Sequence, residues 1–402
     1  MVIEQVYPNN VSLMNNCENK TVAILGAGQM GIAIAAIFLR QRFSVVLYDT
    51  SSTAVESARD RTAAELKMQI ETNLDAALRL LECTDNLQPI CSALYVLESV
   101  TEKKRVKEKL YRQIMPLLKN NAILMSNTST ISITELAETL ENTLIERFCG
   151  FHFFHPVRSR SLVEIVRGNK TSASTIQNVE SLARAIDKTS IAVNDGAGFL
   201  VNRLLNAYLS GALQLLTEGG TIRQIDTAAE RFGMAMGPFR IMDEIGLDVT
   251  LHGGWVLYKA FPDRVEPSPI LLELTRLGFL GRKTGRGFYC YKSAAKHSEV
   301  LQLSTKTPSL STAEVMTMWD TPVTDNAELN AMIAKQFINK NNESAESFTN
   351  EKILARTVGE MFHEAQRILD DGVTHSLRDL KLAAVLGLGF PQHRWNNDCR
   401  LV

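Results

Sequence analysis

The sequence has no long apolar run of the kind that crosses a membrane. A membrane-spanning helix needs about 20 consecutive apolar residues, and the nearest candidate, residues 198–216, is interrupted by polar side chains that include Arg203. This stretch therefore predicts a buried helix. The first 19 residues lack an apolar core and arginine, so they predict neither a secretory signal nor a typical mitochondrial presequence. The last residue, Val402, does not fit the usual peroxisomal signal.

Cysteine is scarce, and neither sign of charge is in excess. The six cysteines have no CxxC spacing, which predicts reduced thiols in an intracellular protein and neither a disulfide framework nor a metal site. Lysine and arginine number 43 against 44 aspartates and glutamates, for a net charge of −1. This balance gives no indication of nucleic acid or an anionic membrane as a partner. A length of 402 residues predicts two or three domains.

A dinucleotide-binding fingerprint lies near the start of the chain. Residues 26–31 read Gly-Ala-Gly-Gln-Met-Gly, between a predicted strand at 20–25 and a predicted helix at 32–40. The first glycine permits a tight turn, the second lets a pyrophosphate approach the backbone, and the third lets helix and strand pack closely. The helix N-terminus then faces the phosphates with free N–H groups. The predicted cofactor contacts are Gly26, Gly28, Gln29, Met30 and Gly31.

A carboxylate follows the second predicted strand. This strand, at 44–48, ends in Asp49, eighteen residues after Gly31. A carboxylate at this position would bind the 2′-hydroxyl of the adenosine ribose and repel a 2′-phosphate, which favours NAD over NADP. A glycine turn without a nucleotide is the less favoured alternative, because a bare fingerprint would need neither the second strand nor the carboxylate.

Strands and helices alternate through the rest of the first half. A helical stretch at 53–81, a strand at 92–97, a helix at 102–118 and a strand at 122–125 predict an α/β fold with a Rossmann-type, doubly wound parallel sheet. Ligands bind such sheets beyond the carboxyl ends of the strands.

Three segments are predicted at these strand ends, namely Glu98 to Glu102, Ser126 to Ser129 and the region of His152. Polar side chains in the first two have two interpretations each. The short polar side chains of Asn127 to Thr130 would either bind a substrate oxygen or cap the helix expected from Ile133. Glu102 would either serve a site or be a first-turn carboxylate of its own helix.

The segment from Gly150 to Val166 carries two histidines in one apolar run and a glutamate in the next. The two runs predict short strands joined by a turn around Arg158. Antiparallel pairing about this turn would bring His152 and Glu164 face to face. A histidine oriented by a carboxylate can move a proton near neutral pH. The alternative is a core histidine that happens to meet a glutamate.

The second half is predicted to be helical. One helix runs from about 195 to 216, and further helices cover 223–232, 246–260 and 270–277. A basic, glycine-rich loop follows at 281–289. This loop is either a surface turn or a contact for an anionic substrate.

The C-terminal part repeats features of this helical unit. Residues 293–350 are rich in Ser, Thr, Asn and Lys and predict a linker with one helix at 327–338. A helix pair at 351–371 and 377–386 then leads to a glycine–phenylalanine–proline turn, which predicts a partial second copy. The expected organisation is an N-terminal extension (1–19), a Rossmann-type NAD-binding domain (20–194), an all-α C-terminal domain (195–292), the linker (293–350) and a partial second helical domain (351–402).

Together these motifs resemble the 3-hydroxyacyl-CoA dehydrogenase family. Besides the fingerprint with Asp49, the matching segments are SNTST at 126–130, GFHFFHP…LVEIV at 150–166, DGAGFLVNRLL at 195–205, GMAMGPF…GLDV at 233–249 and TGRGFYCY at 284–291. The helical echo at the end is similar to the dehydrogenase part of the multifunctional and peroxisomal bifunctional fatty-acid oxidation enzymes.

The resemblance implies oxidation of L-3-hydroxyacyl-CoA to 3-oxoacyl-CoA with NAD, as in fatty-acid β-oxidation, without a metal. It makes His152 the general base and Glu164 the residue that orients it. It assigns Ser129 and Asn202 to the reacting oxygen and the thioester side of the substrate.

The resemblance also extends the cofactor site. It places Glu102 and Lys107 near the nicotinamide end, together with Ser129 and His155. His155 departs from the family pattern, in which this position is often Asn or Ser, and it substitutes a larger, titratable group for a small polar one.

Two other functions stay open at this stage. One is a dehydrogenase of another hydroxyacid, against which the histidine–glutamate pairing argues, and the other is a non-catalytic NAD-binding protein such as a lens crystallin. The expected partner is an acyl-CoA substrate, with no nucleic acid and no membrane span. A homodimer through the helical domain is one expectation, and a second copy that covers this surface internally is the other. We expect an intracellular location, with peroxisome or cytoplasm favoured over mitochondrion.

Overall fold

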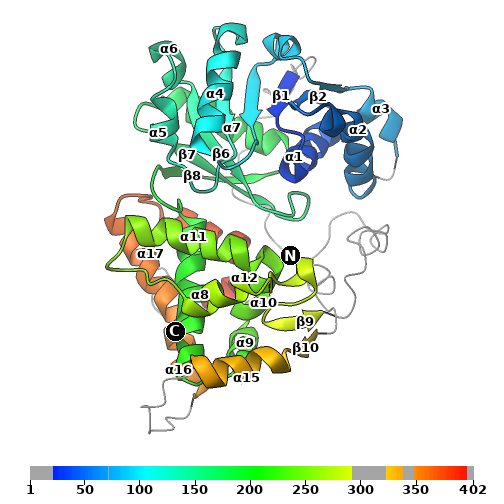
Figure 1. The fold of residues 1–402 in the computed structure, drawn as a ribbon. Helices are drawn as coiled ribbons and strands as arrows, with labels where there is room; N and C mark the ends of the chain where they lie inside the picture. The colour runs from blue at the N-terminus through cyan, green and yellow to red at the C-terminus, as the bar shows by residue number, and fades with distance from the viewer. Residues whose placement is uncertain (1–20, 71, 292–322, 338–347, 396–402) are drawn as a thin grey trace.

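The computed structural model describes residues 21–70, 72–291, 323–337 and 348–395. Figure 1 shows an α/β unit stacked on a helical unit, and the chain passes from the first to the second ahead of helix α8. No helix in the described ranges is long and apolar enough to cross a membrane.

The α/β unit is built on an eight-stranded sheet in the order β3-β2-β1-β4-β5-β6-β7-β8. The strands are β1 (Thr21–Leu25), β2 (Ser44–Tyr48), β3 (Leu81–Thr84), β4 (Tyr95–Glu98), β5 (Ile123–Ser126), β6 (Phe148–Phe153), β7 (Leu162–Arg167) and β8 (Thr189–Asn194). Neighbouring strands from β3 through β6 pair in parallel, whereas β7 is antiparallel to β6 and parallel to β8. The Rossmann-type arrangement is confirmed, with a reversed strand pair at one edge.

Alternate residues of each strand serve two different apolar layers, as the period of a strand requires. In β1, Val22 and Ile24 pack in a core with α1 (Gln29–Arg40) and α7 (Ala173–Ala185), whereas Ala23 and Leu25 pack in a second core with α4 (Lys104–Ile114). The second core continues into the helical unit. The remaining helices here are α2 (Ser52–Lys67), α3 (Leu74–Leu78), α5 (Ile133–Ala137) and α6 (Asn142–Ile145).

Two predictions in this unit were wrong in detail. The single helical stretch predicted at 53–81 is two helices, and the edge strand β3 follows them. β4 begins at Tyr95 and not at 92, because Gln88–Ser92 form a 3-10 helix with Pro89 in its first turn.

The helical unit contains α8 (Val201–Thr217), α9 (Ile222–Phe232), α10 (Pro238–Ile245), α11 (Leu247–Ala260) and α12 (Pro269–Arg276). Helix α8 begins later than predicted, because Gly198 and Phe199 have positive φ angles of 72° and 51° that a right-handed helix does not accept. Helix α10 was missed by the sequence reasoning.

The described part of the predicted linker packs on the helical unit. Strand β10 (Val323–Asp325) pairs with β9 (Tyr289–Tyr291), and α15 (Ala327–Gln336) follows it. The amide of Asn326 donates a 2.9 Å hydrogen bond to the carbonyl of Gly287. The helix predicted at 327–338 is confirmed over Ala327–Gln336, and the strand before it was not foreseen. Residues 293–322 and 338–347 of this segment, like the predicted extension at 1–19, lie outside the described ranges.

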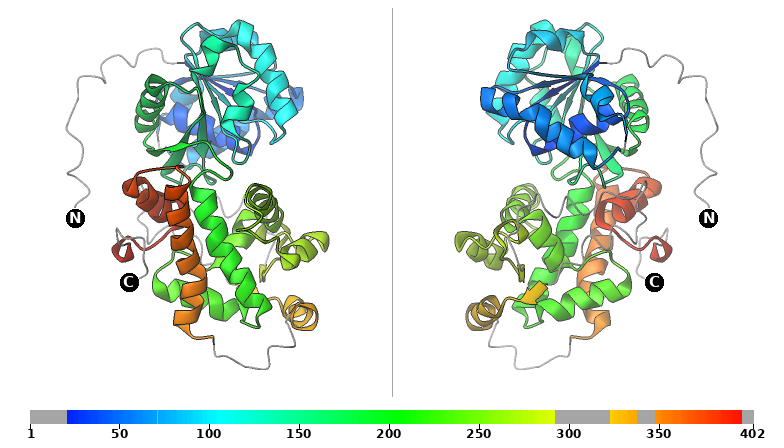
Figure 2. Two further views of the ribbon diagram at one scale, coloured as in Figure 1. Left: turned by 90° about the vertical axis from the view of Figure 1, so that its left-hand side faces the viewer. Right: turned by 90° about the vertical axis from the view of Figure 1, so that its right-hand side faces the viewer.

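The C-terminal helices pack against α8, and the two segments make reciprocal contacts with each other. A π-helical turn (355–359) and α17 (Glu360–Asp370) run beside α8 (Figure 2), whereas α16 (Asn350–Leu354), which precedes them, packs on α9. Helix α18 (Leu377–Leu382) follows α17. Arg203 in α8 pairs with Asp371 at 2.8 Å, and Arg356 pairs with Glu218 at 2.9 Å. Both arginines precede an acidic-glycine pair by the same number of residues, so the two ion pairs are counterparts. This reciprocity is what an isologous contact between two copies produces, and it supports the predicted second helical copy.

Candidate active site

The predicted pairing of His152 with Glu164 is present. Strands β6 and β7 align the two residues directly opposite each other, and His152 Nδ1 lies 2.8 Å from Glu164 Oε2. His152 is 6% exposed and Glu164 is 0% exposed. The prediction of two antiparallel strands about a turn near Arg158 is confirmed.

Glu164 also forms hydrogen bonds with the N-terminus of α8, the first helix of the helical unit. Its second oxygen, Oε1, accepts hydrogen bonds from the backbone N–H groups of Leu200 and Val201, at 3.1 and 2.9 Å. These groups stand at the N-terminus of α8, where unpaired N–H donors and the helix dipole favour a negative charge. The buried carboxylate is thereby held in one orientation from two sides.

The imidazole of His152 is fixed by this carboxylate and by aromatic rings. Phe154 and Phe199 meet it edge-on, with ring centroids 4.6 and 5.9 Å away. A carboxylate at Nδ1 favours the tautomer that carries its proton on Nδ1, so Nε2 keeps a free lone pair. The arrangement is therefore suited to accept a proton at Nε2.

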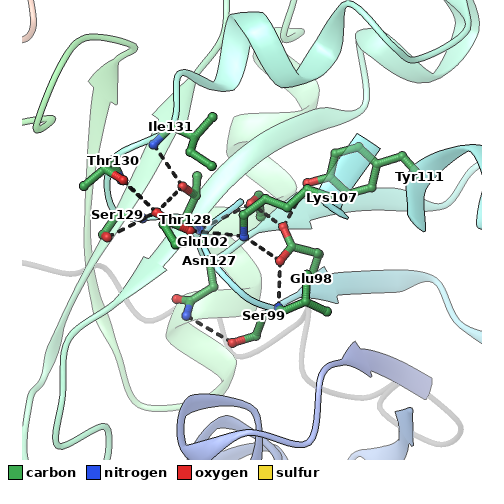
Figure 3. Close-up of polar contacts among 12 residues, drawn as sticks. Glu98, Ser99, Glu102, Lys107, Tyr111, Asn127, Thr128, Ser129, Thr130 and Ile131 are labelled. Carbon is green, nitrogen blue, oxygen red and sulfur yellow. Dashed lines mark hydrogen bonds and ion pairs between the residues drawn. The ribbon is translucent and has the colours of Figure 1, made fainter. Parts of the chain in front are cut away.

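Residues 128–130 form a cup of donors around one oxygen of Glu102. Glu102 Oε1 accepts from the hydroxyl of Thr128 at 2.6 Å, from the N–H and hydroxyl of Ser129 at 2.9 and 3.3 Å, and from the N–H and hydroxyl of Thr130 at 3.1 and 3.0 Å. Figure 3 shows these contacts. Burial alone would raise the pKa of Glu102, but the Lys107 ammonium and these hydrogen bonds lower it to about 2.

Lys107 lies next to Glu102 and is almost fully buried, at 1% exposure. Its Nζ lies 2.7 Å from Glu98 Oε1 and 3.3 Å from Glu102 Oε2 (Figure 3). Glu98 also accepts from Tyr111 at 2.9 Å and from Ser126 at 2.7 Å. The buried ammonium of Lys107 therefore meets the predicted cofactor region through its ion pair with Glu102.

Two asparagines form hydrogen bonds between separate elements of the site. The amide of Asn202, in the first turn of α8, donates to the carbonyl of Ser129 at 3.4 Å. Asn127 accepts from the backbone N–H of Phe153 at 2.9 Å and donates to Ser99 at 3.3 Å. The alternative role predicted for residues 127–130 was to cap helix α5. Ser132 has this role instead, because its hydroxyl accepts a 3.1 Å hydrogen bond from the N–H of Glu135.

The fingerprint turn fits a dinucleotide. A Cβ on Gly31 would lie 1.8 Å from the carbonyl oxygen of Gly26, and Gly26 itself has φ +115°, so both positions require glycine. A Cβ on Gly28 would meet nothing within 4 Å, which leaves open space above the backbone where the helix N-terminus points. Asp49 accepts from the N–H of Ala27 at 2.8 Å and from that of Ser51 at 3.0 Å, and it is partly exposed beside this turn. Gln29 and Met30 open α1 at the same place.

His155 lies on the exposed side of this turn. Its Nε2 is 2.9 Å from the side-chain nitrogen of Gln29. The basic loop at 281–289 is neutralised by acidic neighbours, because Arg282 pairs with Glu244 at 2.5 Å and Lys283 pairs with Asp248 at 2.5 Å. The surface-turn interpretation of this loop is the one that these ion pairs favour.

Sequence reasoning placed Glu98 at a strand end but gave it no role, and it missed the backbone groups of Leu200 and Val201. Glu98 carried a signal, because it is a carboxylate at the end of a buried apolar strand, where an unpaired charge is costly. The N–H groups carried none, since any residue type offers them.

Comparison with known proteins agrees with this geometry. The family model described as 3-hydroxyacyl-CoA dehydrogenase, NAD binding domain, matches residues 21–196, and the model of the C-terminal domain of the same enzymes matches residues 198–291. The chain belongs to the 3-hydroxyacyl-CoA dehydrogenase family. It is an NAD-dependent oxidoreductase, and NAD is its cofactor.

Three solved structures illustrate the relationship of this dehydrogenase to others. (S)-3-Hydroxybutyryl-CoA dehydrogenase from Ralstonia eutropha is 36% identical, with 68% of this chain and 100% of that chain covered and a TM-score of 0.65. 3-Hydroxybutyryl-CoA dehydrogenase from Escherichia coli K12 is 25% identical, covers 93% of this chain and 89% of its own, and has a TM-score of 0.74. The dehydrogenase part of multifunctional enzyme 1 from C. elegans is 25% identical, covers 92% and 78%, and has a TM-score of 0.62.

Proposed function

We propose that this dehydrogenase oxidises the 3-hydroxyl group of L-3-hydroxyacyl-CoA thioesters to a ketone, as a step of fatty-acid β-oxidation. The observation that carries the proposal is the contact of 2.8 Å between His152 Nδ1 and Glu164 Oε2 at the carboxyl end of β6. The oxidation removes a proton from the hydroxyl and a hydride from C3. NAD, when bound, would accept the hydride.

His152 is the general base in this proposal. Its Nε2 takes the hydroxyl proton, and the imidazolium that forms is stabilised by the Glu164 carboxylate, which is already oriented by α8. Phe154 and Phe199 keep the ring from turning. In the reverse direction the same imidazolium returns the proton to the alkoxide.

Ser129 and Asn202 hold the substrate in this proposal. Asn202 is adjacent in the chain to Val201, which binds Glu164, and its own amide contacts the Ser129 carbonyl. The first turn of α8 therefore brings the base and the polar loop into one neighbourhood. The Ser129 hydroxyl, once it leaves its 3.3 Å contact with Glu102, and the second N–H of the Asn202 amide are suited to donate to the reacting oxygen and the thioester carbonyl.

The cofactor is held by the fingerprint turn and by Asp49 in this proposal. The N–H groups at the start of α1 bind the pyrophosphate, and Asp49 binds the adenosine ribose. Glu102 fixes the 128–130 loop beside the nicotinamide end, and Lys107 acts through Glu102. We further propose an intracellular location in peroxisome or cytoplasm.

The test uses the purified full-length chain with acetoacetyl-CoA and NADH, and follows the loss of NADH absorbance from about pH 6 to 9. Oxidation of NADH that depends on acetoacetyl-CoA supports the proposal. NADH binding without any turnover across this range would instead indicate a non-catalytic NAD-binding protein, and turnover with free oxoacids but not with the thioester would indicate another dehydrogenase.

A further inference from the structure

The contact between Gln29 and His155 crosses the sheet. Gln29 opens α1 directly after β1, and His155 follows the carboxyl end of β6. In the sheet, β4 and β5 lie between these two strands. Three strand spacings of about 4.8 Å separate β1 from β6 by about 14 Å. The two side chains nevertheless meet at 2.9 Å, so together they span the carboxyl ends of β4 and β5.

This contact lies at the strand ends where this type of sheet binds a dinucleotide. The chain order reverses between β1 and β4, and a dinucleotide on this fold binds outside the strand ends at that reversal. Gly28, whose missing side chain leaves open space, stands immediately before Gln29. A cofactor that enters or leaves across the fingerprint turn therefore passes close to the Gln29–His155 contact.

The backbone on the His155 side is firmly anchored. Val157 is buried, and the ammonium of Lys188 donates to the carbonyls of Val157 and Arg160 at 2.5 and 2.6 Å. Arg158 in the same turn pairs with Glu65 of α2 at 3.3 Å. The contact therefore opens by rotation of the two exposed side chains and not by movement of the turn.

We propose that Gln29 and His155 form a side-chain clasp that limits the rate at which NAD and NADH enter and leave the dinucleotide site at these strand ends. The Gln29 amide donates to the unprotonated Nε2 of His155 and closes this site in the absence of cofactor. Since the contact also closes above the bound cofactor, it slows both association and dissociation. The inference requires only that NAD binds this fold, and it does not depend on which acyl-CoA is oxidised.

The test is stopped-flow measurement of NADH binding by its fluorescence, with full-length wild type, Gln29→Met, His155→Phe and the double variant. Gln29→Met keeps the length of the side chain and removes the donor. Gln41→Met is the matched control, because Gln41 lies at the other end of α1 and contacts Asp187. Loss of one exposed hydrogen bond should raise both kon and koff about two- to tenfold, with a smaller change in Kd.

The double variant should exchange cofactor no faster than the faster single variant, because both substitutions remove the same contact. Unchanged rate constants in the single variants would overturn the clasp, as would a rise in koff alone, which would mean that the side chains simply bind the cofactor. Absence of NADH binding to the wild type would contradict the cofactor assignment instead, so the two failures are distinguishable.

Discussion

Glu164 joins the two halves of this dehydrogenase at the base of its proposed active site. One carboxylate oxygen lies 2.8 Å from His152 Nδ1, and the other accepts the backbone N–H groups of Leu200 and Val201 at the start of α8. The same side chain therefore orients the histidine and docks the helical unit. Its removal should affect both chemistry and domain packing.

Replacement of Glu164 by Gln should lower turnover by on the order of 10²-fold or more, because a neutral amide no longer stabilises the imidazolium and no longer enforces its tautomer. Steady-state kinetics with acetoacetyl-CoA and NADH measure this effect. Circular dichroism and a thermal unfolding curve serve as the control for packing, since the amide oxygen can still accept from α8. Full turnover in a folded variant would contradict the role given to Glu164.

Replacement of Glu102 by Gln should reduce stability at neutral pH but not in strong acid. The folded-state pKa of Glu102 is about 2, below its ordinary value of 4.5, so its ionised form contributes stability above about pH 4.5. This contribution is lost as the pH falls from about 4.5 to about 2. Urea unfolding of wild type and variant over this range should show a difference in unfolding free energy that shrinks towards acid. A constant difference would argue against the lowered pKa.

Asp243 should make the free energy of unfolding depend on pH in the opposite direction to Glu102. Burial raises its pKa to about 7, although it accepts from the N–H groups of Phe288 and Tyr289 and from the hydroxyl of Tyr291. Between about pH 4 and 7 the folded state then binds a proton that the unfolded state has lost, so the free energy of unfolding falls as the pH rises. Urea unfolding of Asp243→Asn should show a less negative slope in this window. An unchanged slope would show that another group titrates.

The contact between α8 and the C-terminal helices can be tested at a glycine. A Cβ on Gly211 would lie 1.7 Å from the carbonyl oxygen of Arg356, so Gly211→Ala should cost at least about 2 kcal/mol in unfolding free energy. The control is Gly253→Ala in α11, where a Cβ meets nothing within 4 Å and a helical alanine should stabilise by about 0.5–1 kcal/mol. Thermal denaturation compares the two. Similar effects at both positions would contradict the close packing.

The sequence predicted the parts of the site that depend on local spacing. His152 and Glu164 stand symmetrically about one turn, so their pairing followed from the register of a hairpin. The fingerprint glycines and Asp49 followed from their distance along the chain. These features need only short-range geometry, which a pattern of residues encodes directly.

The contacts that the sequence did not predict join side chains from elements far apart in the chain. The resemblance placed Lys107 near the nicotinamide end of the cofactor site, but it did not show that Glu98 and Glu102 pair with its ammonium. Gln29 and His155 are 126 positions apart, and no local pattern relates them. Strand β10 is three residues long and pairs with β9 across residues outside the described ranges, so its periodicity was too short to be recognised.

Single-turnover and steady-state kinetics of His152→Gln test the central claim most directly. With acetoacetyl-CoA and NADH, turnover should fall by on the order of 10²-fold or more, since the proton acceptor and donor is lost. NADH binding, measured by fluorescence in the same preparation, should remain within about twofold of the wild type, because His152 lies outside the fingerprint turn. Unchanged turnover in a folded variant that binds NADH would contradict the account.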